Sequence, residues 1–409
     1  MSLDLVISDA CLAGRAGRFD IGIKDGIVAE IAPHIAADAP REGAEGCLAF
    51  GGFVESHIHL DKACILDRCT IADGTLAEAI GLTAAAKAGF TVEDVYARAA
   101  RVMEMAILHG TTRMRSFVEV DPRAGFRSFE ALLRIRSDYA FAVDLQLCAF
   151  AQEGLTNEPA TAAMLEEALK AGADLVGGCP YTDPNPVAHV SAIFDIAERY
   201  GAATDFHADF DLDPERTILP EIIAQTRARG YGGRVSVGHV TKLSAMVPER
   251  VARLVEQLKD AGVAVSVLPA TDLFLTGRGV DRLIPRGLAP AALMAECGVV
   301  VALATNNFLN PFTPFGDGSL IRIANLFANV AHLARDSDIA AVFDMVTVNA
   351  ARQIGVRYGL AVGMSADVVL IDASDPISAV RQVAPVVAGW KGGRKSFVRG
   401  RTQLLKPAK

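Results

Sequence analysis

Short apolar runs alternate with long amphipathic stretches through most of the chain. The runs span residues 53–57, 112–120, 145–150, 174–177, 203–207, 235–239, 263–268 and 299–305. Between them, stretches such as 91–109, 160–171, 190–200, 248–261 and 290–297 have the apolar spacing of helices. Eight strands that alternate with helices predict parallel βα units closed into a (β/α)8 TIM barrel of the α/β class. An open doubly wound sheet is the alternative, but no Gly-x-Gly-x-x-Gly follows the first run.

Both ends of the chain have the pattern of β structure. Residues 5–10, 20–23 and 27–31 predict strands near the start, and Lys24-Asp25-Gly26 is a hairpin-turn signal. Residues 366–372, 386–390 and 396–400 predict strands near the end. We therefore expect a small β-sandwich domain of residues 1–50 plus 359–409, beside a barrel of residues 51–358.

The composition limits the classes of binding partner and the cellular compartment that we expect for this chain. The 409 residues are 51% hydrophobic and carry a net charge of −8, which argues against nucleic acid or an anionic membrane and for a small-molecule substrate. Residues 1–7 lack the basic start of a signal peptide, and no apolar run reaches membrane-spanning length. The seven scattered cysteines are expected to be free thiols in a reducing cytoplasm. A homo-oligomer remains open.

Four of the eight histidines fall at the ends of three predicted strands. His57 and His59 are two residues apart at the end of the first strand, so their rings point to the same side. His207 ends the fifth strand and His239 the sixth. In a barrel, active residues lie at the C-terminal ends of the strands. Three imidazoles can hold one divalent ion and leave a coordination position open for water, the pattern of a catalytic site.

The stretch 53–62, Phe-Val-Glu-Ser-His-Ile-His-Leu-Asp-Lys, resembles the metal-binding opening of the amidohydrolase superfamily. It is most similar to the branch with cytosine deaminase and the hydrolase of N-isopropylammelide. Residues 149–154 resemble that branch's loop after the third strand, whose glutamine, here Gln152, contacts the substrate ring. Residues 358–370 resemble the superfamily's return into its small β domain.

The resemblance implies a metal-dependent hydrolase of C–N bonds, acting on a small cyclic amide or aminated heterocycle with metal-held hydroxide as the nucleophile. It implies His57, His59 and His207 as ligands of one divalent ion, zinc by preference, with iron or manganese as alternatives. His239 is then the fourth active-site histidine, which stabilises the oxyanion or relays a proton.

Two positions depart from the superfamily pattern. Asn306 stands where an aspartate binds the metal and shuttles the proton, and Phe210 stands where cytosine deaminase has a glutamate. A neutral amide cannot act as a general base. Among other acids, Asp209 ranks first as a replacement because it lies two residues after His207. The remaining candidates are Asp61, Asp272 and Glu119.

Other side chains near strand ends are candidates for the pocket. Lys62 could orient a substrate carboxylate, and Asn307 follows the last strand beside Asn306. Five phenylalanines could form an apolar wall: Phe117, Phe210, Phe274, Phe308 and Phe312. The main alternative to a hydrolase is a barrel that binds a ligand without hydrolysing it, having lost activity through Asn306. A third interpretation is that Asn306 was introduced to trap a substrate.

Overall fold

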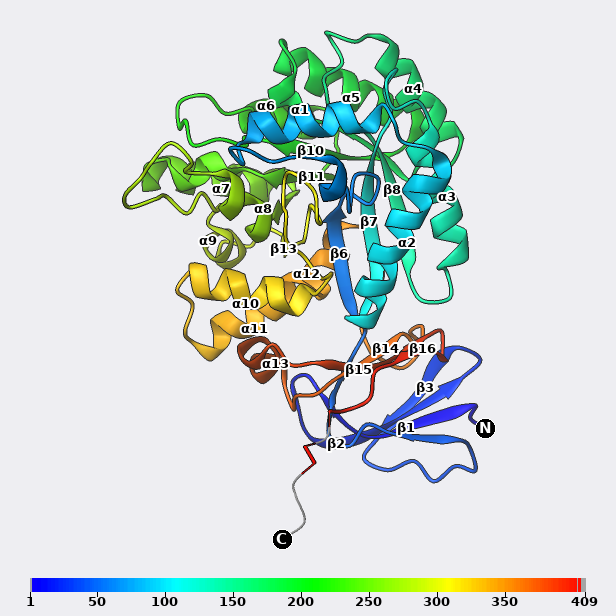
Figure 1. The fold of residues 1–409 in the computed structure, drawn as a ribbon. Coiled ribbons are helices and arrows are strands. Elements are labelled where there is room, and N and C mark those ends of the chain that lie inside the picture. Colours follow the sequence, from blue (N-terminus) through cyan, green and yellow to red (C-terminus); the bar gives the residue numbers. More distant parts are fainter. Residues whose placement is uncertain (1, 403, 406–409) are drawn as a thin grey trace.

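A parallel barrel forms the larger part of the computed structural model, which describes residues 2–402 and 404–405 (Figure 1). Within these residues, eight strands pair in the order β13-β12-β11-β10-β9-β8-β7-β6. Their bounds are β6 Phe53–Ile58, β7 Thr111–Glu119, β8 Asp144–Ala151, β9 Leu175–Gly178, β10 Ala203–Ala208, β11 Val235–His239, β12 Val263–Val267 and β13 Val301–Leu303. The predicted TIM barrel is confirmed. The last strand is shorter than the run 299–305 that predicted it.

The barrel closes where the chain leaves β13 and meets β6. The backbone N–H of Asn306 donates to the carbonyl of His57 at 2.9 Å, and the N–H of His59 donates to the carbonyl of Asn306 at 2.9 Å. Asn306 has a left-handed backbone (φ +61°), a conformation that asparagine tolerates better than most residues. The contact that closes the barrel therefore joins the backbone of His57 and His59 to Asn306.

Helices surround the barrel and present their apolar faces to it (Figure 1). They are α2 Val92–Leu108, α3 Arg127–Asp138, α4 Ala160–Lys170, α5 Pro186–Tyr200, α6 Leu219–Ala228, α7 Pro248–Ala261, α8 Pro269–Leu275, α9 Ala291–Glu296, α10 Leu320–Val330, α11 Asp336–Met345 and α12 Val348–Gln353. The helix predicted over 190–200 begins earlier, because Asn185 caps it by accepting from the Ala188 N–H and Pro186 suits its first turn. None of the helices in the described ranges has the length and apolar character that crossing a membrane requires.

One helix, α1 (Leu76–Lys87), crosses the end of the barrel at which the strands finish (Figure 1). Thr75 caps its start by accepting from the Glu78 N–H at 3.2 Å. The Glu78 carboxylate in turn accepts from the backbone N–H groups of residues 72–74. The incoming loop is thus fastened to the first turn of the helix.

The two ends of the chain join in one mixed sheet, which confirms the prediction of a small β domain built from both termini. Its order is β16-β15-β14-β5-β1-β2-β3, and β4 pairs with β1. The bounds are β1 Leu5–Leu12, β2 Arg15–Lys24, β3 Ile27–Ala32, β4 Arg41–Gly43, β5 Leu48–Phe50, β14 Val368–Ile371, β15 Val386–Lys391 and β16 Arg394–Val398, with α13 Pro376–Gln382 between β14 and β15. Trp390 and Ile21 are buried in its core. Residues 403 and 406–409 of the predicted terminal domain lie outside the described residues.

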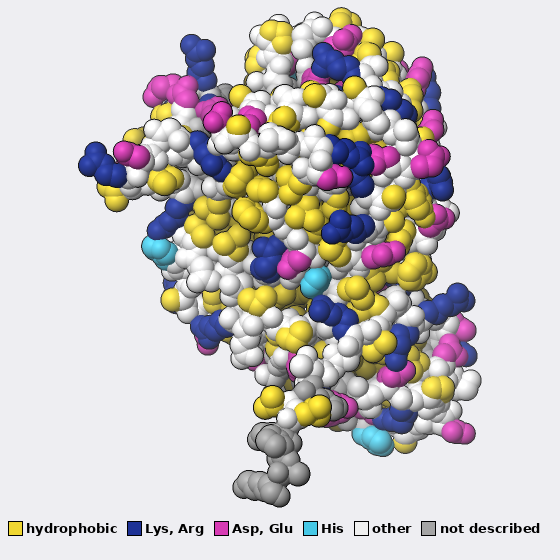
Figure 2. All heavy atoms as spheres, in the orientation of Figure 1, with side chains coloured by type: hydrophobic (Ala, Val, Ile, Leu, Met, Phe, Trp, Pro, Cys, Tyr) yellow, Lys and Arg dark blue, Asp and Glu magenta, His cyan; other side chains and the backbone are white. Residues whose placement is uncertain are grey.

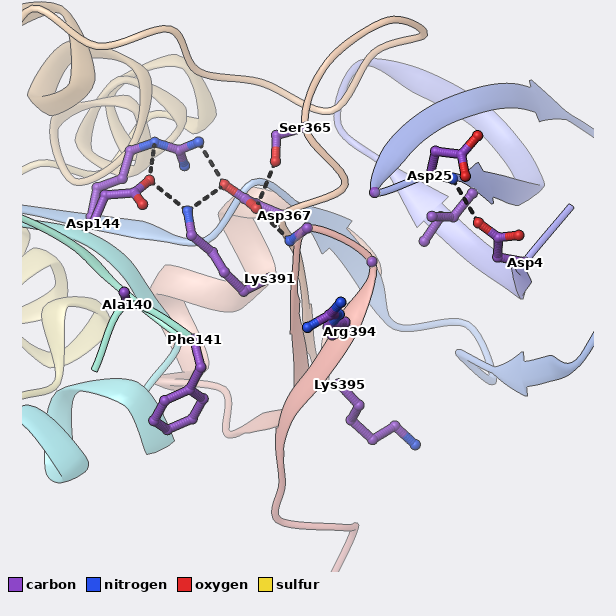
Figure 3. A pocket seen from close by; sticks show the side chains of 15 residues that line it. Asp4, Asp25, Ala140, Phe141, Asp144, Ser365, Asp367, Lys391, Arg394 and Lys395 are labelled. Atoms are coloured by element: carbon purple, nitrogen blue, oxygen red, sulfur yellow. Dashed lines mark hydrogen bonds and ion pairs between the residues drawn. The ribbon is translucent and has the colours of Figure 1, made fainter. Parts of the chain in front are cut away.

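A surface hollow of about 940 Å³ lies between this sheet and the barrel, and buried charges form its floor (Figure 3). Asp367 is 2% exposed and accepts from Arg113 Nη2 at 2.7 Å and from Lys391 Nζ at 2.8 Å. Although burial pushes the pKa of Asp367 upward, Lys391 and the other donors hold it below its ordinary value. This carboxylate links β7 of the barrel to the terminal sheet.

We expect Asp367→Asn to lower the free energy of unfolding by about 3 kcal/mol, because it removes the short ionic partner of the buried Arg113 guanidinium, which then keeps, within the described residues, only the exposed Asp144 at 3.9 Å. Urea unfolding followed by circular dichroism measures the change. Asp25→Asn in the same hollow is the control, since Asp25 is exposed and asparagine tolerates its left-handed backbone; its effect should stay within about 0.5 kcal/mol. Equal effects of the two changes would contradict the structural role of Asp367.

Candidate active site

Three histidines converge at the barrel end that α1 covers. His57 on β6, His59 just after it and His207 on β10 are each no more than 2% exposed. One ring nitrogen from each lies within 4.8 Å of the others. Both ring nitrogens of His57, Nδ1 of His59 and Nε2 of His207 find no hydrogen-bond partner among the described residues. Buried polar atoms normally have partners, so this group of nitrogens is available to bind an ion.

The donor set fits a divalent metal. Burial lowers the pKa of all three imidazoles well below the ordinary range, which keeps them in the neutral form that binds metals. Both polar atoms of the Asn306 side chain are also buried, with no partner in the described part of the chain. Its amide oxygen could add a neutral ligand on the side where the barrel closes. We infer that His57, His59 and His207 would hold the ion.

Aromatic rings and a glycine hold the imidazoles in place. The ring centres of His57 and Phe117 are 4.1 Å apart, and the ring centres of His207 and Phe150 are 4.3 Å apart. A Cβ at Gly238 would lie 2.7 Å from Cε1 of His57. Glycine before His239 is therefore required for β11 to lie beside the His57 ring.

His239 forms a buried pair with Asp272. Its Nδ1 donates to Asp272 Oδ1 at 2.7 Å, which leaves Nε2 for the cavity. Asp272 comes from α8 and is fully buried, and burial raises its pKa above the ordinary value. The ring of Phe210 lies 4.2 Å from that of His239. Of the candidate acids, Asp272 is thus the one that contacts an active-site histidine by a short hydrogen bond.

The expectation that Asp209 replaces the missing base needs correction. The backbone of Asp209 is left-handed (φ +53°), so the side-chain alternation of β10 stops before it. Its carboxylate accepts from the Ile218 N–H at 3.1 Å and from the Thr217 hydroxyl. Asp209 thus fastens the loop before α6 and does not line the cavity.

The cavity beside the histidines is small and well covered. Its lining comprises His59, Lys62, Leu76, Gln152, Tyr181, His207, Phe210, His239, Thr271, Asn306, Asn307 and Phe312. The structure therefore brings together the predicted residues Lys62, Gln152, Phe210 and Asn307. Leu76 reaches it from α1 and packs in one cluster with Phe210 and Phe312. Figure 2 shows hydrophobic side chains gathered on the surface between α1 and α10.

A buried ionic cluster supports one wall of the cavity. Lys62 Nζ donates to Glu119 Oε1 at 2.7 Å and to Gln152 Oε1 at 3.0 Å. Lys87 of α1 donates to the other oxygen of Glu119 at 2.9 Å, and it also pairs with Asp121 and Glu153. These three carboxylates are close enough to hold a metal ion, but the ammonium of Lys87 occupies their centre.

Sequence reasoning missed four contributors to the site. Lys87 and Leu76 come from the covering helix, while Tyr181 lines the cavity from the short 3-10 turn after β9 and Thr271 from the first turn of α8, which follows β12. Tyr181 and Thr271 come within four residues of the ends of the predicted strands 174–177 and 263–268, so the strand-end rule could have included them. The sequence carries no comparable signal for Lys87 and Leu76. In a helical stretch, a lysine usually faces solvent and a leucine usually faces the core.

These features define a hydrolase-type barrel with a candidate metal centre, and comparison with known proteins identifies the family. The family model described as "Amidohydrolase family" matches residues 72–397. The chain belongs to this family. It is an amidohydrolase-type hydrolase of non-peptide C–N bonds, similar to cytosine deaminase.

Two relatives and one solved structure show the breadth of the similarity. An N-isopropylammelide isopropyl amidohydrolase of Pseudomonas sp. (strain ADP) is 27% identical over 407 residues, covering 96% of each chain. A pterin deaminase of Rhizobium rhizogenes is 28% identical over 364 residues, covering 87% of this chain and 82% of its own. The crystal structure of 5-methylcytosine deaminase from Klebsiella pneumoniae with 5-fluorocytosine has a TM-score of 0.94 and 31% identity, covering 99% of this chain and 100% of its own.

Elemental analysis of the purified protein should find about one divalent ion per chain. His207→Ala should lose most of that metal, because two imidazoles hold an ion much less tightly than three. His34→Ala, which changes an exposed histidine just after β3, should keep the metal. Equal metal content in both variants would contradict the assignment of His207.

Proposed function

We propose that the protein hydrolyses the bond between a ring carbon and nitrogen in a small cyclic amide or aminated N-heterocycle. The convergence of His57, His59 and His207, with buried ring nitrogens that lack protein partners in the described residues, is the observation that carries this proposal. The lining of the neighbouring cavity is suited to a planar ring. Phe210 and Phe312 supply apolar faces, and Gln152 supplies hydrogen-bonding groups at the edge. The relatives' named substrates are small N-heterocycles too.

Zinc is the ion we expect, with iron or manganese as alternatives. When bound, such an ion lowers the pKa of a coordinated water to ~7, which makes a nucleophile available at neutral pH. The protein's own contribution is to hold the ring against Gln152, to exclude water beneath α1, and to move protons. His239 is the residue we assign to proton transfer, since its Nε2 faces the cavity while Asp272 fixes the tautomer.

We expect Asp272→Asn to lower kcat by roughly 10²–10⁴, because the amide no longer holds the His239 proton at Nδ1. Metal content should be unchanged. Asp209→Asn is the matched control, since that carboxylate is also buried but faces the loop before α6; its kcat should remain within a few-fold of the unmodified protein. If both variants lose activity to the same extent while folded, the relay through Asp272 is wrong.

The neutral Asn306 predicts weak turnover of the usual deaminase substrates. Ammonia release from cytosine, 5-methylcytosine and aminated triazines should therefore be slow, and Asn306→Asp should raise it by roughly 10²–10⁴ by restoring a carboxylate base. Aspartate accepts the left-handed backbone at this position, so the fold should be retained. Failure of the metal-loaded protein and of Asn306→Asp to release ammonia or amine from any of these rings would overturn the proposed function.

A further inference from the structure

A loop with an exposed apolar end projects from the side of the barrel between α8 and α9 (Figure 1). Residues 278–286 of this loop are exposed without interruption, and we call them the tip. Leu283 is 100% exposed, more than any other large apolar side chain in the described residues, and its neighbour Ile284 is 59% exposed. Single exposed apolar residues are ordinary, but two in succession at the end of a projecting loop suit a contact with another molecule.

The backbone of Leu283 is unfavourable as well. Its φ is +48°, in the left-handed region that leucine rarely adopts. Such a conformation costs free energy and persists where other interactions compensate for it. Because the Leu283 side chain is fully exposed, packing within the described residues does not compensate for it. A partner that covered Leu283 would offset this cost.

The tip is basic although the chain as a whole is acidic. It has Arg278, Arg282 and Arg286 against one acid, Asp281, while the whole chain carries a net charge of −8. Within the described residues Arg282 pairs only with Asp281, at 3.7 Å, and both side chains are almost fully exposed. An ion pair in water contributes little, so the Arg282 guanidinium beside Leu283 is free to pair with a partner.

A groove between α9 and α11 has the complementary character. It has a volume of about 350 Å³, and its two helices lie on the side of the barrel from which the tip projects (Figure 1). Three acids line it, Glu296, Asp338 and Asp344, against one base, Arg335. Its apolar lining comprises Ala292, Ala295, Leu333, Ala341 and Met345. The groove therefore combines an apolar floor with an acidic rim.

Asp344 is the acid of this groove that lacks a partner. Arg335 lies 3.4 Å from Glu296 and 2.8 Å from Asp338, whereas the Asp344 carboxylate forms no hydrogen bond or ion pair within the described residues. Desolvation by its surroundings raises the pKa of Asp344 above its ordinary value. A guanidinium from another molecule would compensate this carboxylate.

We propose that the groove binds the tip of a second copy of the chain, with Leu283 and Ile284 on the apolar floor and Arg282 at Asp344. Each copy has a tip and a groove on one side, so a two-fold axis forms the contact twice and leaves neither element unpaired. Opposite charges favour tip against groove over tip against tip or groove against groove. This inference does not depend on the proposed function.

Sedimentation of the purified full chain at micromolar concentrations tests the dimer. The unmodified protein should sediment as a dimer. Leu283→Asp should weaken the dimer at least tenfold, because it places a charge in an apolar contact that forms twice. Aspartate tolerates the left-handed backbone, so the fold should be retained. Val362→Asp is the matched control, since it makes the same kind of change at an exposed residue in the turn beside β3, and it should leave the dimer unchanged.

An exchange of charges identifies the groove. Arg282→Glu and Asp344→Arg should each weaken the dimer at least tenfold, since each sets like charges against one another. An equal mixture of the two variants should form a mixed dimer about as tight as the unmodified one, because each of its two contacts again joins an acid to a base. Circular dichroism checks that every variant is folded.

Three outcomes would overturn the inference. A monomer at every concentration would mean that the tip contacts a different protein or none. A dimer that is unchanged in folded Leu283→Asp would place the interface elsewhere. Weakening by both single charge variants without recovery in their mixture would reject the groove between α9 and α11 as the partner of the tip.

Discussion

The site depends on the two hydrogen bonds that close the barrel. Asn306 donates to the carbonyl of His57 and accepts from the N–H of His59, and both bonds are 2.9 Å long. The backbone of His57 and His59 is therefore fixed to Asn306, their neighbour in the barrel wall. Because a parallel sheet places alternate side chains on one face, fixing this register also fixes the direction of the His57 and His59 rings. The contact that closes the barrel therefore also orients two histidines of the site.

Six buried polar atoms that lack a partner in the described residues lie together where a ligand would bind, on His57, His59, His207 and Asn306. Elsewhere, buried charges are compensated at short range, as in the Asp367 group and the cluster around Glu119. At the histidines and the Asn306 side chain the described residues offer no such compensation. Burying polar groups in this way is unfavourable for folding, and binding of an ion offsets that cost. Among the described residues that line the cavity there is no acid, so Asp272 acts on a ligand through His239.

The sequence predicted those parts of the site that follow from local pattern. Strand-end positions and the two-residue spacing were enough to predict that His57, His59, His207 and His239 lie together. The reason is that the barrel places the C-terminal ends of all its strands on one side. Asp209 shows where local pattern fails: its alternation with His207 held only while the backbone stayed extended, and a left-handed φ turned the carboxylate toward the loop before α6.

The contacts that sequence could not supply join distant parts of the chain. Asp272 meets His239 from the next βα unit, and Lys87 reaches Glu119 from a helix inserted after the first strand. Nothing in the spacing of these residues encodes the pairing, since it depends on how separate elements pack. The orientation of the Gln152 amide likewise follows from a lysine 90 positions earlier in the chain.

Glu119 accepts hydrogen bonds from two lysines, Lys62 in the cavity lining and Lys87 in the covering helix. A neutral substitution at Glu119, Lys62 or Lys87 leaves a buried charge without its partner. Single mutations at these positions are therefore expected to lower stability. Phe210 forms no ion pair within the described residues, so a substitution there leaves no buried charge without a partner. The left-handed backbone of Asn306 restricts that position to residues that tolerate it. Divergence toward new substrates is therefore expected to begin at Phe210, while Glu119, Lys62 and Lys87 are retained together.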